Sequence, residues 1–114
     1  MPVKRAPRMT ATKPPTAAKP KRGRRVPRPF EFHWGRGQIV EEACFTGTYA
    51  EPAIQLLEYD DHPDAFTIRF CYYDHQGRFQ RSPMMIDSTE TLDGLREALR
   101  RTPKLRALLR RLVS

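Results

Sequence analysis

The first 29 residues most strongly limit what this chain folds into, because they combine many prolines with many positive charges. They hold seven of the eleven prolines, ten Lys or Arg residues and no acid. Such a segment buries too little apolar surface to offset the entropy that ordering it costs. We therefore predict a disordered basic arm over residues 1–29 and one small domain over residues 30–114.

Charge is segregated along the chain. The formal net charge is +8, although the arm alone carries +10 and the rest of the chain carries −2. Residues 30–68 are acidic at −7, whereas residues 69–114 are basic at +5. A basic arm beside a basic part of the domain favours a polyanion as partner, above all nucleic acid. The densest part of the arm supplies four candidate nucleic-acid-binding residues: Lys21, Arg22, Arg24 and Arg25.

The sequence also indicates where in the cell the protein is expected. No apolar run reaches the ~18 residues that a membrane span needs, and no apolar stretch follows the basic N-terminus as it does in a secretory signal. Two cysteines, Cys44 and Cys71, are too few for a disulfide framework, so we expect free thiols in a reducing compartment. We expect a cytoplasmic protein, which would be nucleoid-associated in a bacterium or nuclear in a eukaryote.

Strand patterns are clearest in the middle of the chain. Residues 54–59, 66–73 and 78–86 are predicted strands, and the clearest of them, 66–73, is rich in β-branched and aromatic residues. A turn at residues 60–64 separates the first two, and Asp74–Gly77 separates the last two, with Gly77 in the left-handed position of a three-residue hairpin loop. Weaker strand patterns occupy residues 30–34, which Gly35 and Gly37 would end, and residues 38–49.

Helix patterns follow the strands. Asp87 has the place of an N-cap, and Leu92, Leu95 and Leu99 follow at helical spacing. Thr102-Pro103 restarts the helix, since proline fits a first helical turn and no later one. The predicted fold class is therefore α+β: a three- or four-stranded antiparallel sheet with one or two C-terminal helices packed on one face.

The register of the predicted hairpin separates its two faces. If Asp74 lies opposite Arg78, the residues that share the helix-facing side are Phe66, Ile68, Phe70, Met84 and Ile86. The opposite side carries Thr67, Arg69, Cys71 and Tyr73, across from Met85, Pro83, Arg81 and Phe79. Two rings and two guanidinium groups would then face outward. A register slip of one residue would exchange the two faces.

Rings set among arginines suit single-stranded nucleic acid. Unpaired bases stack on aromatic side chains with little sequence preference, and arginines neutralise the phosphates. An alternative is that Tyr73 and Phe79 form a cross-strand pair that only stabilises the hairpin, or are buried by a second subunit. A second alternative function is a protein-interaction module whose aromatic face docks a partner protein. A third is a peripheral membrane protein that uses the basic amphipathic residues 103–113.

The stretch IRFCYYDHQGRFQRSPMMID and the following TLDGLREAL resemble the positive-cofactor-four family of transcriptional coactivators. The shared layout is a strand with paired aromatics, an acidic-to-glycine turn, a basic return strand and a closing helix, over residues 54–99. The resemblance implies a curved antiparallel sheet backed by a helix, a homodimer that pairs through helices, and binding of single-stranded or melted DNA. It places that role on Arg69, Tyr73, Arg78, Phe79 and Arg81. The family lacks the second helix that Pro103 starts here.

Patterns for catalysis are weak. The acidic turn of Asp60, Asp61, His62 and Asp64 is typical of a solvated turn, although such residues can also gather a cation. Cys44, Cys71, His33 and His75 lack the spacing of zinc ligands, and there is no glycine-rich phosphate loop. We therefore expect a non-enzymatic protein without a cofactor.

Overall fold

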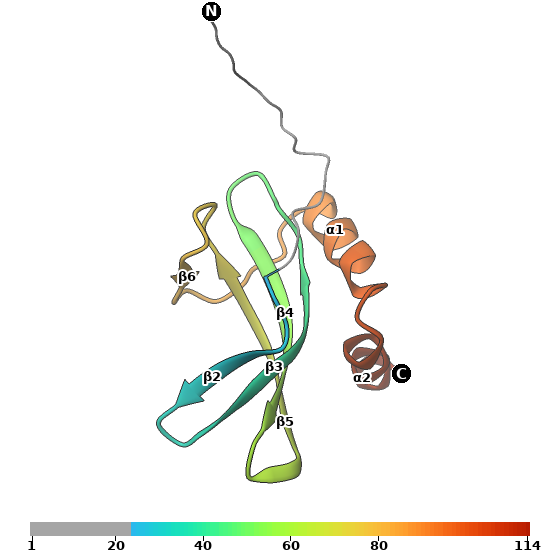
Figure 1. The fold of residues 1–114 in the computed structure, drawn as a ribbon. Coiled ribbons are helices and arrows are strands. Elements are labelled where there is room, and N and C mark those ends of the chain that lie inside the picture. The colour runs from blue at the N-terminus through green and yellow to red at the C-terminus, as the bar shows by residue number, and fades with distance from the viewer. Residues whose placement is uncertain (1–23) are drawn as a thin grey trace, which may run out of the picture.

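A computed structural model describes residues 24–114 and shows a five-stranded antiparallel sheet followed by two helices (Figure 1). Strands that are neighbours in the sheet are also consecutive in the chain. The elements are β2 (Arg28–Phe32), β3 (Gly35–Cys44), β4 (Glu51–Tyr59), β5 (His62–Tyr73), β6 (Phe79–Gln80), α1 (Thr89–Leu99) and α2 (Pro103–Val113). The predicted α+β layout is confirmed, whereas the predicted number of three or four strands is too low.

The folded part begins earlier than predicted. β2 starts at Arg28, and the side chains of Arg24 and Arg28 both reach carboxylates on the sheet. Residues 24–29 therefore belong to the fold and not to a disordered arm. From composition alone, these arginines were predicted to be solvated. In the fold they pair with buried acids that lie far along the chain. The prediction of disorder for residues 1–23 falls outside the described residues.

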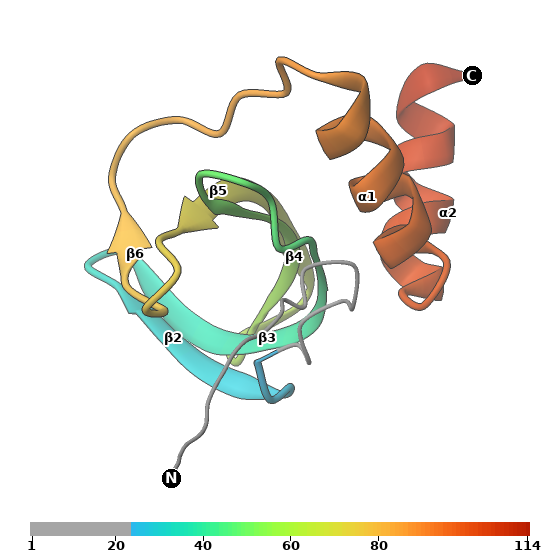
Figure 2. The ribbon, with the colours of Figure 1, turned by 90° about the horizontal axis from the view of Figure 1, so that it is seen from above.

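The sheet curls about its concave side, and the two helices lie on its convex side (Figures 1 and 2). The buried residues between the sheet and the helices are Ile54, Leu56, Leu95 and Leu105. A second buried group, on the concave side, is Phe30, Ile39 and Leu57. β4 is thus covered on both faces, which explains its nearly continuous burial and the apolar run in its sequence.

A β-bulge in β3 decides which side of the sheet each of two adjacent carboxylates faces. The pairing with β4 shifts at Val40, which lies between the paired residues Ile39 and Glu41. Glu41 then faces the helices, and Glu42 faces the concave side. The extra residue explains why neither side chain follows the simple alternation of a strand.

The carboxylate of Glu41 caps α2. This helix begins at Pro103 as predicted, and Thr102 occupies the N-cap position without making a side-chain capping bond. Instead, the two oxygens of Glu41 accept the backbone N–H groups of Lys104 at 3.2 Å and Leu105 at 2.8 Å. A negative charge at these otherwise unpaired donors stabilises the start of the helix.

α1 begins one residue later than predicted. The prediction of Asp87 as the N-cap is wrong, because Ser88 takes that position and its Oγ accepts the N–H of Thr91 at 3.1 Å. Leu95 is buried but Leu92 is 54% exposed, so the predicted stripe meets the sheet only in part. Within residues 24–114 no helix is both long and apolar enough to cross a bilayer.

The β5–β6 hairpin has the predicted turn and register. Gly77 has a φ of +85°, the left-handed conformation that glycine adopts most easily. The N–H of Asp74 donates to the carbonyl of Arg78 at 2.9 Å, and Tyr73 pairs with Phe79 across the two strands. The local turn chemistry thus sets which residues face each other at this end of the sheet.

The return strand of the hairpin is much shorter than predicted. β6 ends at Gln80, so the prediction of a strand over residues 78–86 is wrong beyond that point. The predicted partners that form no ladder are Arg81, Pro83 and Met85. Pro83 has no N–H to donate, and Met84 packs on the convex core as the chain crosses toward α1.

The two glycines near the start of the sheet do not end a strand as predicted. Gly35 begins β3, and Gly37 lies inside it. A Cβ on Gly37 would lie 1.9 Å from the backbone oxygen of Glu58 on the neighbouring strand β4, so the backbones of β3 and β4 lie too close for a side chain at this position. Glycine in this strand marks a close backbone approach and not a stop.

Candidate nucleic-acid interface

Two arginines of the predicted arm close one end of the concave face. Arg28 donates to both carboxylate oxygens of Glu42, at 3.0 and 3.2 Å. Arg24 lies 3.4 Å from Glu42 and 3.1 Å from Glu51. The carboxylate side chains are 1% and 2% exposed, so the arginines neutralise charges that would otherwise be buried without a partner. Arg24 was predicted to contact nucleic acid, but the fold uses its charge internally.

The side-chain amide of Gln55 connects this ion-pair cluster to the middle of the sheet. Its Nε2 donates to Glu42 at 2.8 Å and to the hydroxyl of Tyr73 at 2.9 Å. Its Oε1 accepts from Nε of Arg69 at 2.8 Å. Gln55 is completely buried, and these three bonds satisfy its amide. Gln55 on β4 therefore holds side chains of both neighbouring strands, β3 and β5, in place.

Burial and neighbouring charges shift the pKa of three groups on the concave face. Burial alone would lower the pKa of Arg28, but the hydrogen bond and the charge of Glu42 outweigh it and raise the pKa. Burial raises the pKa of both thiols, Cys44 and Cys71. Both cysteines are free, and a raised pKa keeps them protonated and poorly nucleophilic. Neither thiol is therefore activated as a nucleophile.

Tyr73 is not exposed as predicted. It is 7% exposed, its hydroxyl also accepts from Arg28 at 3.3 Å, and the guanidinium of Arg24 lies 3.6 Å from the centre of its ring. The edge of Phe79 packs against it at 5.6 Å between ring centroids. The side of the hairpin that carries Tyr73 was predicted correctly, but the segment that precedes β2 covers the ring.

An open set of side chains remains beside Tyr73, and we call Trp34, Phe32, Arg69 and Phe79 the aromatic row. The rings of Trp34 and Phe32 stack at 4.6 Å between centroids. The guanidinium of Arg69 lies 5.7 Å from the centre of Phe32 and 5.0 Å from that of Phe79. Trp34 is 66% exposed and Phe79 is 47% exposed. The row thus alternates flat apolar surfaces with a cation.

The curl of the sheet assembles the aromatic row. Phe32 ends β2 and Trp34 lies in the β2–β3 turn, while Arg69 is on β5 and Phe79 is on β6. β2 and β6 are the two edge strands of the sheet, and in the view from above they approach each other across the concave side (Figure 2). The alternation of Phe30, Phe32 and Trp34 is visible in the sequence, but their proximity to Arg69 depends on this curvature.

The other predicted residues are scattered around the row. Arg78 is exposed in the hairpin turn, where its Nε lies 2.8 Å from the carboxylate of Asp74. Hydrogen bonds from the backbone and side chain of Arg78 lower the pKa of that carboxyl group. Arg81 is exposed just past β6, and Arg25 is exposed before β2. Lys21 and Arg22 lie outside the described residues.

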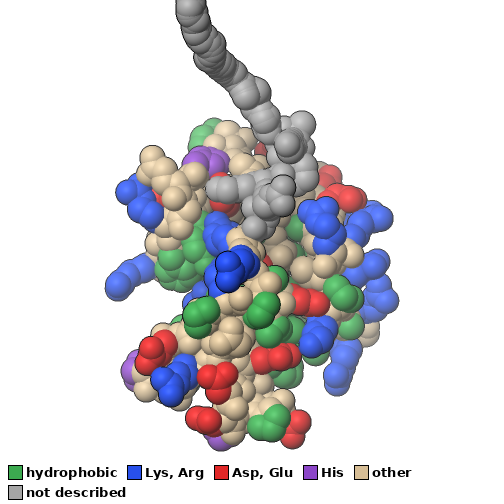
Figure 3. Space-filling view, in the orientation of Figure 1, with side chains coloured by type: hydrophobic (Ala, Val, Ile, Leu, Met, Phe, Trp, Pro, Cys, Tyr) green, Lys and Arg blue, Asp and Glu red, His purple; other side chains and the backbone are tan. Residues whose placement is uncertain are grey.

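Exposed charge is separated across the surface. In Figure 3 the Lys and Arg side chains gather over the helices, and the acids gather toward the β4–β5 turn. The exposed basic residues of the helical region are Arg96, Arg100, Arg101, Lys104, Arg106, Arg110 and Arg111. Within residues 24–114, no group of three or more His, Cys, Asp or Glu side chains is placed to hold a metal ion, and this includes the acidic turn.

Comparison with known proteins finds no family model, no curated protein and no solved structure that matches this chain.

Proposed function

We propose that this chain is a non-catalytic protein that binds nucleic acid, with single-stranded or melted DNA as the favoured partner. The observation that carries the proposal is the aromatic row, in which Arg69 lies between Phe32 and Phe79 and Trp34 extends the stack. Bases that are already unpaired can stack on exposed rings, a contact worth ~1–3 kcal/mol per base. Paired bases in a duplex have no free face to offer.

Cations near the row suit the phosphates that accompany such bases. Arg78 and Arg81 are exposed on either side of β6, which carries Phe79. The segment before Arg24 adds seven more Lys or Arg residues without an acid. Their contribution would be electrostatic and sensitive to salt, whereas the stacking would persist at higher salt. A partner of this kind is consistent with a location in the cytoplasm, at a nucleoid or in a nucleus.

The curled sheet backed by helices agrees with the layout that the positive-cofactor-four resemblance implies. Membership in that family, and a homodimer that pairs through helices, remain predictions. The details differ from the implied site, since the exposed ring of Trp34, stacked on the half-buried Phe32, takes the place of Tyr73. We therefore rest the proposal on the aromatic row and not on the resemblance.

Titration of the full chain with a fluorescent single-stranded oligonucleotide at several salt concentrations tests this function. The double variant Trp34→Ala/Phe79→Ala should lose at least about tenfold in affinity, because two stacking contacts of ~1–3 kcal/mol each disappear. A matched control, Phe66→Ala/Leu112→Ala, removes two apolar side chains that are 50% and 73% exposed away from the row. Equal losses in both variants, or no binding by the parent chain, would reject the proposal.

A protein-docking function is the second candidate, and the 66% exposure of Trp34 favours it. Exposed tryptophans are frequent anchors of protein–protein interfaces. A pulldown with the full chain from nuclease-treated lysate separates the two functions. Retention of one partner protein that depends on Trp34, without retention of the chain on a single-stranded DNA column, would favour docking over nucleic-acid binding.

A further inference from the structure

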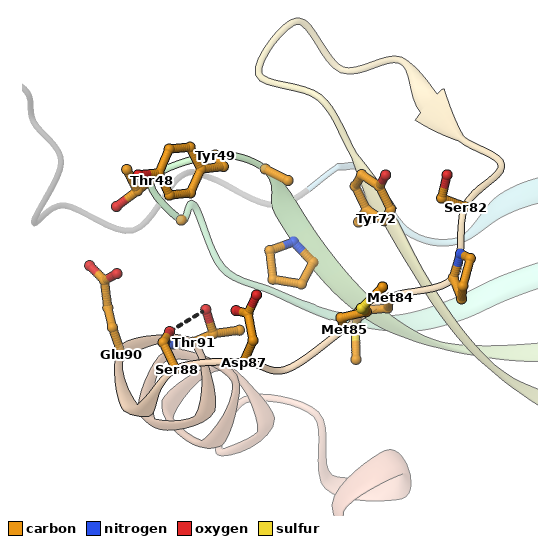
Figure 4. A pocket seen from close by; sticks show the side chains of 14 residues that line it. Thr48, Tyr49, Tyr72, Ser82, Met84, Met85, Asp87, Ser88, Glu90 and Thr91 are labelled. Carbon is orange, nitrogen blue, oxygen red and sulfur yellow. Dashed lines mark hydrogen bonds between the residues drawn. The ribbon is translucent and has the colours of Figure 1, made fainter.

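A groove lies on the side of the molecule away from the β4–β5 turn, between the β3–β4 loop, the end of β5 and the segment that leads into α1. Its volume is about 730 Å³. Figure 4 shows side chains from these separate parts of the chain around the same space. The apolar groups that line it are Tyr49, Pro52, Tyr72, Pro83, Met84 and Met85. None of these residues belongs to the aromatic row.

Two of the large apolar side chains that line the groove are strongly exposed. Tyr49 is 92% exposed and Met85 is 71% exposed. Grooves lined with aromatic side chains bind proline-rich segments, because such segments are extended before they bind and present flat pyrrolidine rings. Methionine side chains adapt to the shape of the bound segment. The chemistry of the groove therefore fits a proline-rich occupant.

The groove also selects for positive charge. Asp87 and Glu90 line it near the start of α1, and none of the described residues that line it is Lys or Arg. This one-sided charge is notable in a chain with 21 Lys and Arg residues. A cationic segment would pair with the two carboxylates, whereas an acidic segment would be repelled.

A segment with both properties precedes the described chain, which starts on the concave face close to one end of this groove. The described chain starts at Arg24, whose guanidinium lies 3.1 Å from Glu51, and Glu51 lies between the groove residues Ala50 and Pro52. The preceding residues 13–22 read KPPTAAKPKR, with three prolines, four cations and no acid. In polyproline II conformation ten residues span about 31 Å, which is ample to lie along a groove next to the chain's entry point.

We propose that residues 13–22 bind in this groove within the same molecule, with the prolines against Tyr49 and Tyr72 and the cations near Asp87 and Glu90. The arm then has a binding site of its own on the domain, separate from any contact with nucleic acid. The inference does not depend on the proposed function, because it concerns only two parts of one chain.

Photo-crosslinking of the full chain tests the inference. A benzophenone side chain placed at Ala17 reacts preferentially with methionine C–H bonds, so irradiation should join it to Met84 or Met85, as mapped by mass spectrometry. The same probe placed at Val113, which is 81% exposed at the end of α2, is the positional control. Crosslinks to these methionines should fall several-fold in Tyr49→Ser/Glu90→Lys, while crosslinks from position 17 to the neighbouring Met9 should persist.

Two outcomes would overturn the proposal. Crosslinks from position 17 that are spread over the surface of the protein would show that the groove does not hold the segment. Crosslinks to Met84 or Met85 that are equally frequent in the parent chain and in Tyr49→Ser/Glu90→Lys would show the same. Crosslinked dimers between probe-bearing and isotope-labelled chains would show that the occupant comes from a second copy. As an independent readout, replacing Pro14, Pro15 and Pro20 with Ala should shift the ε-methyl NMR signals of Met84 and Met85, and unchanged signals would also reject it.

Discussion

The guanidinium group of Arg24 lies 3.6 Å from the centre of the Tyr73 ring. This contact joins the chain just before β2 to the last residue of β5, and it covers a ring that the hairpin register alone leaves open to water. A cation over an aromatic face contributes ~0.5–2 kcal/mol, with the larger values in desolvated sites. The contact therefore gives Tyr73 a role in stability, and in the proposed function the rings beside it contact the ligand.

Tyr73→Phe should destabilise the fold without weakening the binding of single-stranded DNA. The substitution removes the oxygen that accepts hydrogen bonds from Gln55 and Arg28. Leaving a buried donor of Gln55 without this partner should lower the free energy of unfolding by about 1–3 kcal/mol, as measured by urea denaturation. Tyr49→Phe, at a ring that is 92% exposed, is the control and should change stability little. A loss of affinity in Tyr73→Phe as large as that of the row variant would contradict this division of roles.

Gly37→Ala should be strongly destabilising. Its Cβ would lie 1.9 Å from the backbone oxygen of Glu58, so the two strands would have to separate. We expect a loss of more than about 2 kcal/mol in the free energy of unfolding, in the range of severe backbone conflicts. Gly35→Ala is the matched control, since its Cβ would meet only the Tyr59 ring at 3.3 Å. If the two variants unfold at the same denaturant concentration, the close strand approach is not as described.

Glu41→Ala should weaken the attachment of α2 to the sheet. The carboxylate accepts the N–H groups of Lys104 and Leu105, and loss of a helix cap costs about 0.5–2 kcal/mol. Glu97→Ala removes a carboxylate that forms an exposed ion pair with Arg100 and should cost less than about 1 kcal/mol. Hydrogen exchange should quicken at Lys104 and Leu105 in the first variant only. Unchanged exchange at these amides would argue against the cap.

Stability at acidic pH should depend on Asp74. Hydrogen bonds from the backbone and side chain of Arg78 lower its pKa in the folded chain below the ordinary value of about 3.9. A lowered pKa means that this stabilisation is complete above the unfolded pKa and is lost as the pH falls through the folded pKa. The stability difference between the parent chain and Asp74→Asn should therefore be largest near neutral pH and shrink toward pH 2–3. Urea unfolding at each pH measures this, and a difference that grows on acidification would contradict it.

Deleting residues 1–22 should reduce the salt dependence of DNA binding and leave the stacking contribution. The deleted segment holds seven Lys or Arg residues, and each phosphate contact on a single strand contributes about 0.7 to the slope of log affinity against log salt. Deleting residues 1–29 is a different experiment, because it also takes Arg24 and Arg28 from their buried carboxylates and should unfold the domain. An unchanged slope in the shorter deletion would show that the arm does not contact the phosphates.

Local sequence signals predicted the parts of the fold that local chemistry sets. The Asp74–Gly77 turn fixed the hairpin register, because a glycine with positive φ and an Asp side chain suffice to specify that loop. The Thr102-Pro103 pair located the second helix for a similar reason. In each case the residues that decide the structure lie within a few positions of each other.

The parts that the sequence did not predict depend on residues far apart in the chain. Arg24 and Tyr73 are 49 positions apart, yet the guanidinium of Arg24 covers the ring. Phe32 and Arg69 meet only because the sheet curls. A β-bulge at Val40 contributes to such curvature, and no nearby turn residue in the sequence predicts this bulge. Of the aromatic row, the sequence therefore predicted Arg69 and Phe79 on the hairpin, but neither Phe32 nor Trp34 at the other edge of the sheet.

The hydrogen bond from Arg69 to the buried amide of Gln55 has a thermodynamic consequence. A long cationic side chain on a surface normally loses about 0.5–1.5 kcal/mol of rotamer entropy when a partner immobilises it. Here the fold has already immobilised the guanidinium of Arg69 within the aromatic row, so a ligand of the proposed kind would meet a preorganised cation and only the ligand itself would lose freedom.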